Sequence, residues 1–170
     1  MSAEGLLMLK AGFETAQAAN EYLSSLGKKD FKLHDGLCKA LRTLYFTPNG
    51  VLSLLRVIAR GEDVPTERLS QRLINFNDPE WEVRDALNSI DFDRLSKELR
   101  LTLSTTQAFS AIRNGKMSLR RDIQAEINYY GQRNVKPNTK AVDELIQGIE
   151  SLNAEIERLE AAVNLRARTN

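Results

Sequence analysis

A repeated apolar pattern near the C-terminus constrains the fold more strongly than any other part of the sequence. An α-helix repeats about every 3.6 residues, so apolar residues in alternating steps of three and four lie along one stripe of its surface. Such steps connect seven residues here: Val142, Leu145, Ile149, Leu152, Ile156, Leu159 and Val163. The pattern predicts one long helix over 137–170, with Asn138 or Thr139 after Pro137 as its start signal.

Three packing arrangements suit this stripe. Valine and isoleucine alternate with leucine at its heptad positions, which in parallel coils favours two strands and hence a homodimer. In such a pair, however, Glu155 faces Glu160 of the second copy, and Ile146 widens the stripe in a way typical of larger bundles. The sequence leaves open whether the helix packs within its own chain, pairs with a second copy or binds a different protein. In the last two cases the seven stripe residues are the partner-binding residues.

The rest of the chain also carries helical patterns and no strand signals. The helix at 51–59 is apolar almost all round and is expected at the buried centre. The fold class is therefore all-α: a compact multi-helix bundle domain over 1–136, followed by the long, coiled-coil-like helix over 137–170. Apolar spacing, caps and breakers predict helices at about 3–26, 31–46, 51–59, 66–74, 79–90, 92–99, 104–114 and 118–130.

Polar residues before several of these helices are expected to cap them. Thr47 before Pro48 is the expected cap of the helix at 51–59, and Asp91 caps the one that starts at Phe92. Ser104 has a glutamine three residues later, which is the spacing of a capping box. Each cap places a side-chain oxygen where it accepts a hydrogen bond from a backbone N–H at the start of the helix.

The counts of charged, cysteine and histidine residues limit the kinds of site. A net charge of +1 indicates no polyanion partner for the molecule as a whole, and one cysteine with one histidine lacks the zinc, haem and disulfide signatures. Cys38 lies in an apolar run and is expected to be a buried small hydrophobe. No apolar run approaches the roughly 18 residues that cross a bilayer, so we expect no membrane contact and a cytoplasmic location.

Groups suited to catalysis are sparse. His34 and Cys38 share a helical face, but no complete set of activating groups accompanies them. No glycine-rich phosphate loop occurs, and two arginines beside Asp122 and Glu126 favour ion pairs over a bound cation. We therefore expect no enzymatic activity, no cofactor, no metal site and no small-molecule ligand.

Positive charge is concentrated in one segment, residues 100–140, which holds eight lysines and arginines against two acids. A break between two predicted helices with cations around it is suited to contact phosphates. Two other interpretations stay open: the cations pair with acids elsewhere, such as Glu155 and Glu157, or they bind a protein. Four cations surround the break: Arg113, Lys116, Arg120 and Arg121.

The segment Ile112-Arg113-Asn114-Gly115-Lys116 closes a stretch, beginning at Leu95, that resembles the second and third helices of repressor-type helix-turn-helix domains. This resemblance covers about 22 residues and implies nucleic-acid binding by the helix pair. The stretch departs from the family in two ways. Arg100 stands where a turn glycine is usual, and the distance from Leu95 to Ile112 is about three residues longer. No base-reading residue is carried across.

The sequence thus predicts a non-enzymatic helical interaction protein, an adaptor or a subunit of a complex, that uses its C-terminal heptad helix. Its partner is another protein or a second copy of the chain. The alternative is a nucleic-acid-binding protein that uses segment 100–140 in a helix-turn-helix-like arrangement.

Overall fold

A computed structural model describes residues 3–25, 31–63, 91–114, 119–132 and 139–168, together with residues 85 and 88. No strand occurs in these ranges, and their helices pack against one another, which confirms the predicted all-α multi-helix bundle. The predicted helices at 66–74 and 79–90 lie outside the described residues, apart from Asp85 and Asn88, which are helical. The helices are α1 (Ala3–Ser25), α2 (Phe31–Tyr45), α3 (Asn49–Ala59), α6 (Phe92–Glu98), α7 (Leu103–Arg113), α8 (Leu119–Gln132) and α9 (Thr139–Arg168).

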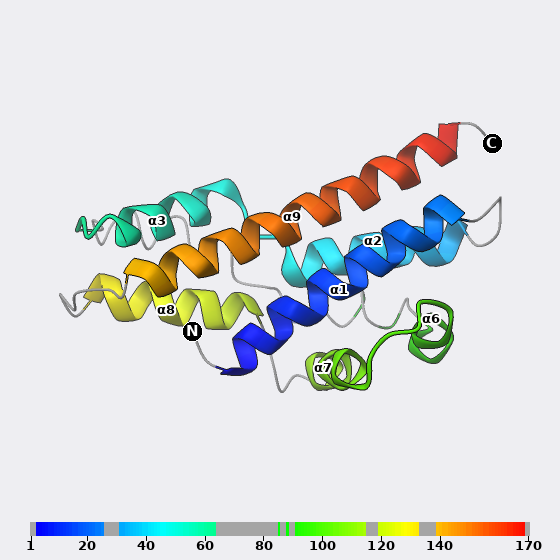
Figure 1. Ribbon diagram of the computed structural model, residues 1–170, viewed down its shortest axis with the longest axis horizontal. Helices are drawn as coiled ribbons and strands as arrows, with labels where there is room; N and C mark the ends of the chain where they lie inside the picture. Colours follow the sequence, from blue (N-terminus) through cyan, green and yellow to red (C-terminus); the bar gives the residue numbers. More distant parts are fainter. Residues whose placement is uncertain are drawn as a thin grey trace.

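Helix α9 is the central element of the described part of the molecule (Figure 1). It packs against α1, α2 and α3, and its apolar stripe joins the buried residues of these helices in one hydrophobic cluster. Helix α3 was expected at the centre because it is apolar almost all round, yet it lies beside α9 and α8. A long helix can contact several short ones along its length, so α9 takes the central place.

Polar contacts define the directions in which the helices run along α9. Asn20 of α1 reaches Glu155, whereas Leu9, earlier in α1, lies against Gly148, so α1 runs in the same direction as α9. Arg42 of α2 pairs with Glu160, and Arg56 of α3 pairs with Glu150. Helices α2 and α3 therefore run one after the other along α9 in the opposite direction.

The junction between α2 and α3 is fixed by a side chain of α9. Asn153 accepts a hydrogen bond from the backbone N–H of Thr47 at 3.0 Å and donates to its carbonyl oxygen at 2.8 Å. The predicted threonine cap is wrong: the N-cap residue of α3 is Pro48, with no side-chain cap, and Thr47 is fully buried. Asn153 supplies the hydrogen bonds that the turn would otherwise take from water.

None of the described helices combines the length and the apolarity that a membrane span requires.

Candidate functional site

The predicted partner-binding stripe lies inside the chain. All seven stripe residues of α9, from Val142 to Val163, are at most 5% exposed, and Ile146 beside them is also buried. They contact α1, α2 and α3. In this conformation the stripe offers no exposed surface, so a partner that used it would have to displace helices of the same chain.

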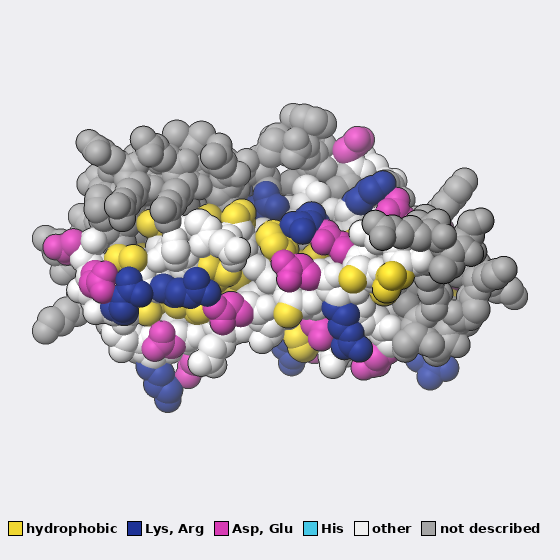
Figure 2. All heavy atoms as spheres, turned by 90° about the horizontal axis from the view of Figure 1, so that it is seen from above, with side chains coloured by type: hydrophobic (Ala, Val, Ile, Leu, Met, Phe, Trp, Pro, Cys, Tyr) yellow, Lys and Arg dark blue, Asp and Glu magenta, His cyan; other side chains and the backbone are white. Residues whose placement is uncertain are grey.

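The surface around α9 is held by polar links within the chain. Glu155, proposed above as an ion-pair partner for the basic segment, instead accepts a hydrogen bond from Asn20 Nδ2 at 2.8 Å. Arg42 is bound to Glu160, and its guanidinium lies 4.1 Å from the ring centroid of Phe46. Figure 2 shows acidic and basic side chains interspersed on the described part of this face. Such a face provides no concentrated charge of one sign.

The four cations that the sequence suggested as phosphate contacts do not form one surface among the described residues. The side chain of Arg113 and all of Lys116 lie outside the described residues. Arg120 is half-buried and donates from Nη2 to the backbone carbonyl of Arg42 at 3.2 Å, at the end of α2. Arg121 is exposed. Arg120 therefore holds α8 to α2, which occupies a donor that was expected to contact phosphate.

Helices α6 and α7 follow one another in the chain, joined by a short turn, at the lower edge of the view in Figure 1. Asp91 caps α6 as predicted: its side chain accepts from the backbone N–H of Arg94 at 3.1 Å. At the other end of α6 the chain reverses at Arg100, which has φ of 51°. The Leu101 N–H bonds to the carbonyl of Ser96 at 3.1 Å, and the Arg100 N–H bonds to that of Lys97 at 3.4 Å. These two bonds form a Schellman motif, in which glycine is the usual left-handed residue.

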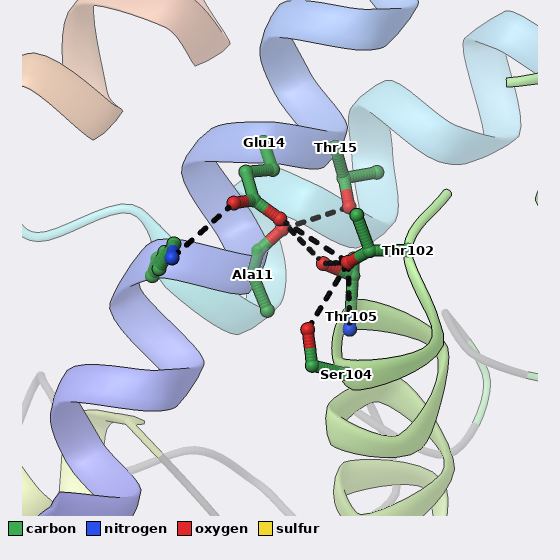
Figure 3. Close-up of polar contacts among 7 residues, drawn as sticks. Ala11, Glu14, Thr15, Thr102, Ser104 and Thr105 are labelled. Atoms are coloured by element: carbon green, nitrogen blue, oxygen red, sulfur yellow. Dashed lines mark hydrogen bonds and ion pairs between the residues drawn. The ribbon is translucent and has the colours of Figure 1, made fainter. Parts of the chain in front are cut away.

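The start of α7 is capped by Thr102 and not by Ser104. The Thr102 hydroxyl accepts from the backbone N–H of Thr105 at 3.3 Å. Thr105 in turn donates its hydroxyl proton to a carboxylate oxygen of Glu14 on α1 at 2.7 Å (Figure 3). The expected capping box at Ser104 is therefore wrong by two residues, because the contact with α1 selects the threonine pair.

Glu14 is the residue through which α1 holds the start of α7. In Figure 3 its carboxylate points toward the hydroxyl groups of Thr102 and Thr105. The other carboxylate oxygen of Glu14 lies 3.8 Å from Nζ of Lys10. Sequence reasoning missed this contact because 91 positions separate Glu14 from Thr105 and neither has a local signal. The contact orients α7 relative to the rest of the bundle.

Helix α7 is buried on one side and exposed on the other. Thr105 and Ala108 are buried on its inner side. Gln107 and Ser110 are exposed on its outer side, and the exposed Asn114 directly follows the helix. The side chains of these three residues are able to donate and to accept hydrogen bonds. Leu103, 74% exposed, lies at the start of the same side. Helix α7 therefore presents uncharged polar side chains on its outer side, while its inner side is packed against the rest of the chain.

Cys38 is buried, as the sequence predicts. Burial raises the pKa of its thiol to about 12, and the negative charges of Glu160 and Asp35 act in the same direction. The thiol is therefore protonated at neutral pH, and a protonated thiol is a poor nucleophile. Within the described ranges, no three side chains among His, Cys, Asp and Glu are grouped as a metal site.

Comparison with models of protein families gave no match, and comparisons with curated proteins and with solved structures gave none either.

Proposed function

We propose that this protein works by binding nucleic acid, and that α6, the turn at Arg100 and α7 form the binding surface. The observation that carries the proposal is the turn itself. The chain adopts a left-handed conformation at the position where the resemblance to helix-turn-helix domains places a turn residue. In helix-turn-helix domains the helix that follows such a turn faces the ligand.

The outer side of α7 has the chemistry that base edges require. Gln107 and Asn114 each offer a donor and an acceptor on one planar group, which matches the edge of adenine in the major groove. Ser110 between them both donates and accepts. An α-helix of this diameter fits the major groove of B-form DNA. Because Thr105 and Ala108 anchor the inner side, α7 can contact a ligand without first becoming ordered.

The charge of the chain supports the same proposal. The surplus of six positive charges in residues 100–140 begins with Arg100 in the turn, and Arg113 at the end of α7 belongs to it. Neutralising phosphates with lysine and arginine releases counterions, so binding at this surface is expected to weaken steeply as salt rises.

The test is a titration of a fluorescently labelled DNA duplex with the protein, followed by anisotropy. At about 50 mM salt we expect saturable binding that weakens strongly by about 200 mM. Replacing Gln107 and Asn114 together by alanine is expected to reduce the affinity, whereas replacing Asn164, exposed near the end of α9, serves as the control. Absence of binding by the wild-type chain at the lower salt would refute the proposal.

Assembly through α9 is the second candidate function, and the heptad stripe favours it. Because the stripe residues pack against the same chain, a second copy would have to exchange its α9 helix with the first. An exchanged dimer unfolds at a midpoint that rises with protein concentration, because association is part of its folding. A monomer by light scattering, with a concentration-independent midpoint, would exclude this assembly.

A further inference from the structure

Within the described part of the chain, two cationic side chains differ from the others in having no hydrogen bond or ion pair. Lys97 at the end of α6 and Arg100 in the turn are both exposed, and neither side chain makes a hydrogen bond or ion pair within the described residues. Other described cations are engaged, in the pairs Lys10–Glu14, Lys39–Asp35, Arg42–Glu160, Arg56–Glu150, Arg60–Glu62, Arg94–Glu98, Lys140–Glu144 and Arg158–Glu155.

The backbones of Lys97 and Arg100 are adjacent at the end of α6. The backbone N–H of Arg100 bonds to the carbonyl oxygen of Lys97. Asp93 stands one helical turn before Lys97, at a spacing that permits an ion pair, but these two side chains form none. Glu98 is already engaged by Arg94 and by the hydroxyl of Tyr22. Among the residues that the structure describes, no acid therefore pairs with Lys97 or Arg100.

Arg100 stands at a backbone position that glycine fits better. Its φ of 51° lies in the left-handed region, which residues with a Cβ adopt infrequently. The Schellman motif needs this conformation and gains nothing from the guanidinium group. An arginine in this infrequent backbone conformation, with no hydrogen bond or ion pair among the described residues, points to a role for its side chain outside the fold.

We propose that Lys97 and Arg100 are the phosphate contacts of the surface formed by α6 and α7. This inference rests on the nucleic-acid binding proposed above and replaces Arg120, whose donor is used within the chain. The two cations precede α7, so they contact the backbone of the nucleic acid beside the groove that α7 enters. Phosphate contacts position a protein on the duplex without reading its sequence.

Arg100→Gly separates the binding role from the structural one. Glycine relieves the backbone at the turn, so the stability of the folded chain is expected to be unchanged or higher. Affinity for a DNA duplex is expected to fall several-fold, by a similar factor for different sequences, and the slope of log affinity against log salt is expected to decrease by about 1. Lys97→Gln is expected to reduce the slope in the same way, and Arg100→Lys is expected to retain it.

The matched control is Arg158→Gln, which removes the same charge from an exposed position on α9. It should leave the salt slope unchanged. If the wild-type chain binds the duplex and Arg100→Gly and Lys97→Gln bind as tightly as Arg158→Gln, this inference is overturned while the proposed function stands. If the wild-type chain binds no duplex, both fail together. A loss of affinity in Arg100→Gly with no change of slope would also reject a phosphate contact.

Discussion

Single polar residues decide how the helices of this protein meet. Asn153 joins α9 to the turn between α2 and α3, and Glu14 joins α1 to α7 through Thr105. Each of these side chains satisfies groups that folding removes from water. Because an unsatisfied buried polar group costs about 1–3 kcal/mol, such contacts favour one arrangement of the helices over others.

Asn153→Ala is expected to be strongly destabilising. It removes both hydrogen bonds to the buried backbone of Thr47, and we expect a loss of about 2–4 kcal/mol in the free energy of unfolding. Urea denaturation followed by circular dichroism measures it. Asn164→Ala, at an exposed position on the same helix, is the control and should change stability by less than about 0.5 kcal/mol. Equal effects of the two substitutions would show that the Thr47 contact is unimportant.

The buried thiol of Cys38 is expected to lower the free energy of unfolding at alkaline pH. Its pKa is about 12 in the folded chain, against 9.0 for a thiol exposed to water. Below pH 9 both states hold the proton, and the protonated thiol contributes its full stability. Between pH 9 and 12 the unfolded chain releases the proton first, so stability falls as pH rises.

Comparison with Cys38→Ala isolates this effect from other titrating groups. The stability advantage of the wild type is expected to shrink by about 1.4 kcal/mol for each pH unit above 9, as measured by urea denaturation at several pH values. Iodoacetamide at pH 8 should label the thiol slowly in the folded chain and rapidly in urea. Rapid labelling without urea would mean that the thiol is accessible and ionised.

At the scale of elements, the close approach of α1 to its neighbours depends on small residues. A Cβ atom added at Gly12 would lie 2.9 Å from Cδ1 of Tyr45, a rigid ring in the core. A Cβ at Gly148 would lie 2.7 Å from Cδ2 of Leu9, the end of a flexible side chain. The two sites look alike in sequence because both are glycines inside helices. Because their neighbours differ, the two positions are expected to differ in how well they tolerate an added Cβ atom.

We therefore expect opposite results from two glycine substitutions. Gly12→Ala should lower stability, because overpacking costs about 1–3 kcal/mol and outweighs the gain of up to about 1 kcal/mol in helix propensity. Gly148→Ala should be close to neutral, since Leu9 can change its rotamer. Thermal unfolding of the two variants side by side provides the measurement. A larger loss at Gly148 than at Gly12 would contradict this packing.

At the scale of the whole molecule, α9 connects elements that are distant in sequence. Its stripe belongs to the same hydrophobic cluster as α1, α2 and α3. Without α9, the buried faces of these helices would be exposed to water, and the loss of buried apolar area would remove much of the driving force for folding.

A chain of residues 1–136 is accordingly expected to lose cooperative unfolding. We expect reduced helical circular dichroism and a broad urea transition, because short helices are marginal without tertiary packing. A chain that ends at residue 165 retains every stripe residue and should unfold like the full chain. A sharp transition for residues 1–136 would instead support the division into a bundle domain and a separate C-terminal helix.

Local sequence patterns predicted the positions of most of the described helices. The predicted ranges 3–26 and 31–46 differ from α1 and α2 by one residue at one end, and the Asp91 cap was correct. These features depend on local interactions: apolar spacing along one helix face, a cap within three residues, and breakers such as Gly61. The residues that make local interactions are only a few positions apart in the sequence, so these interactions can be predicted without knowing the fold.

The contacts of those helices could not be predicted from local patterns, because they depend on how the whole chain packs. The heptad stripe predicts that one face of α9 is buried, but a second copy of the chain could bury that face as well as the same chain does. In the structure, α1, α2 and α3 cover it. Likewise, the hydrogen bond from Thr105 to Glu14 accompanies the cap of α7 at Thr102, and Arg120 donates a hydrogen bond to the backbone carbonyl of Arg42. The sequence showed Arg100 as an unusual turn residue. Whether its guanidinium forms an ion pair depends on the side chains that folding brings near it. Hydrophobic burial has no direction, and the partner of each face depends on the packing of the whole chain.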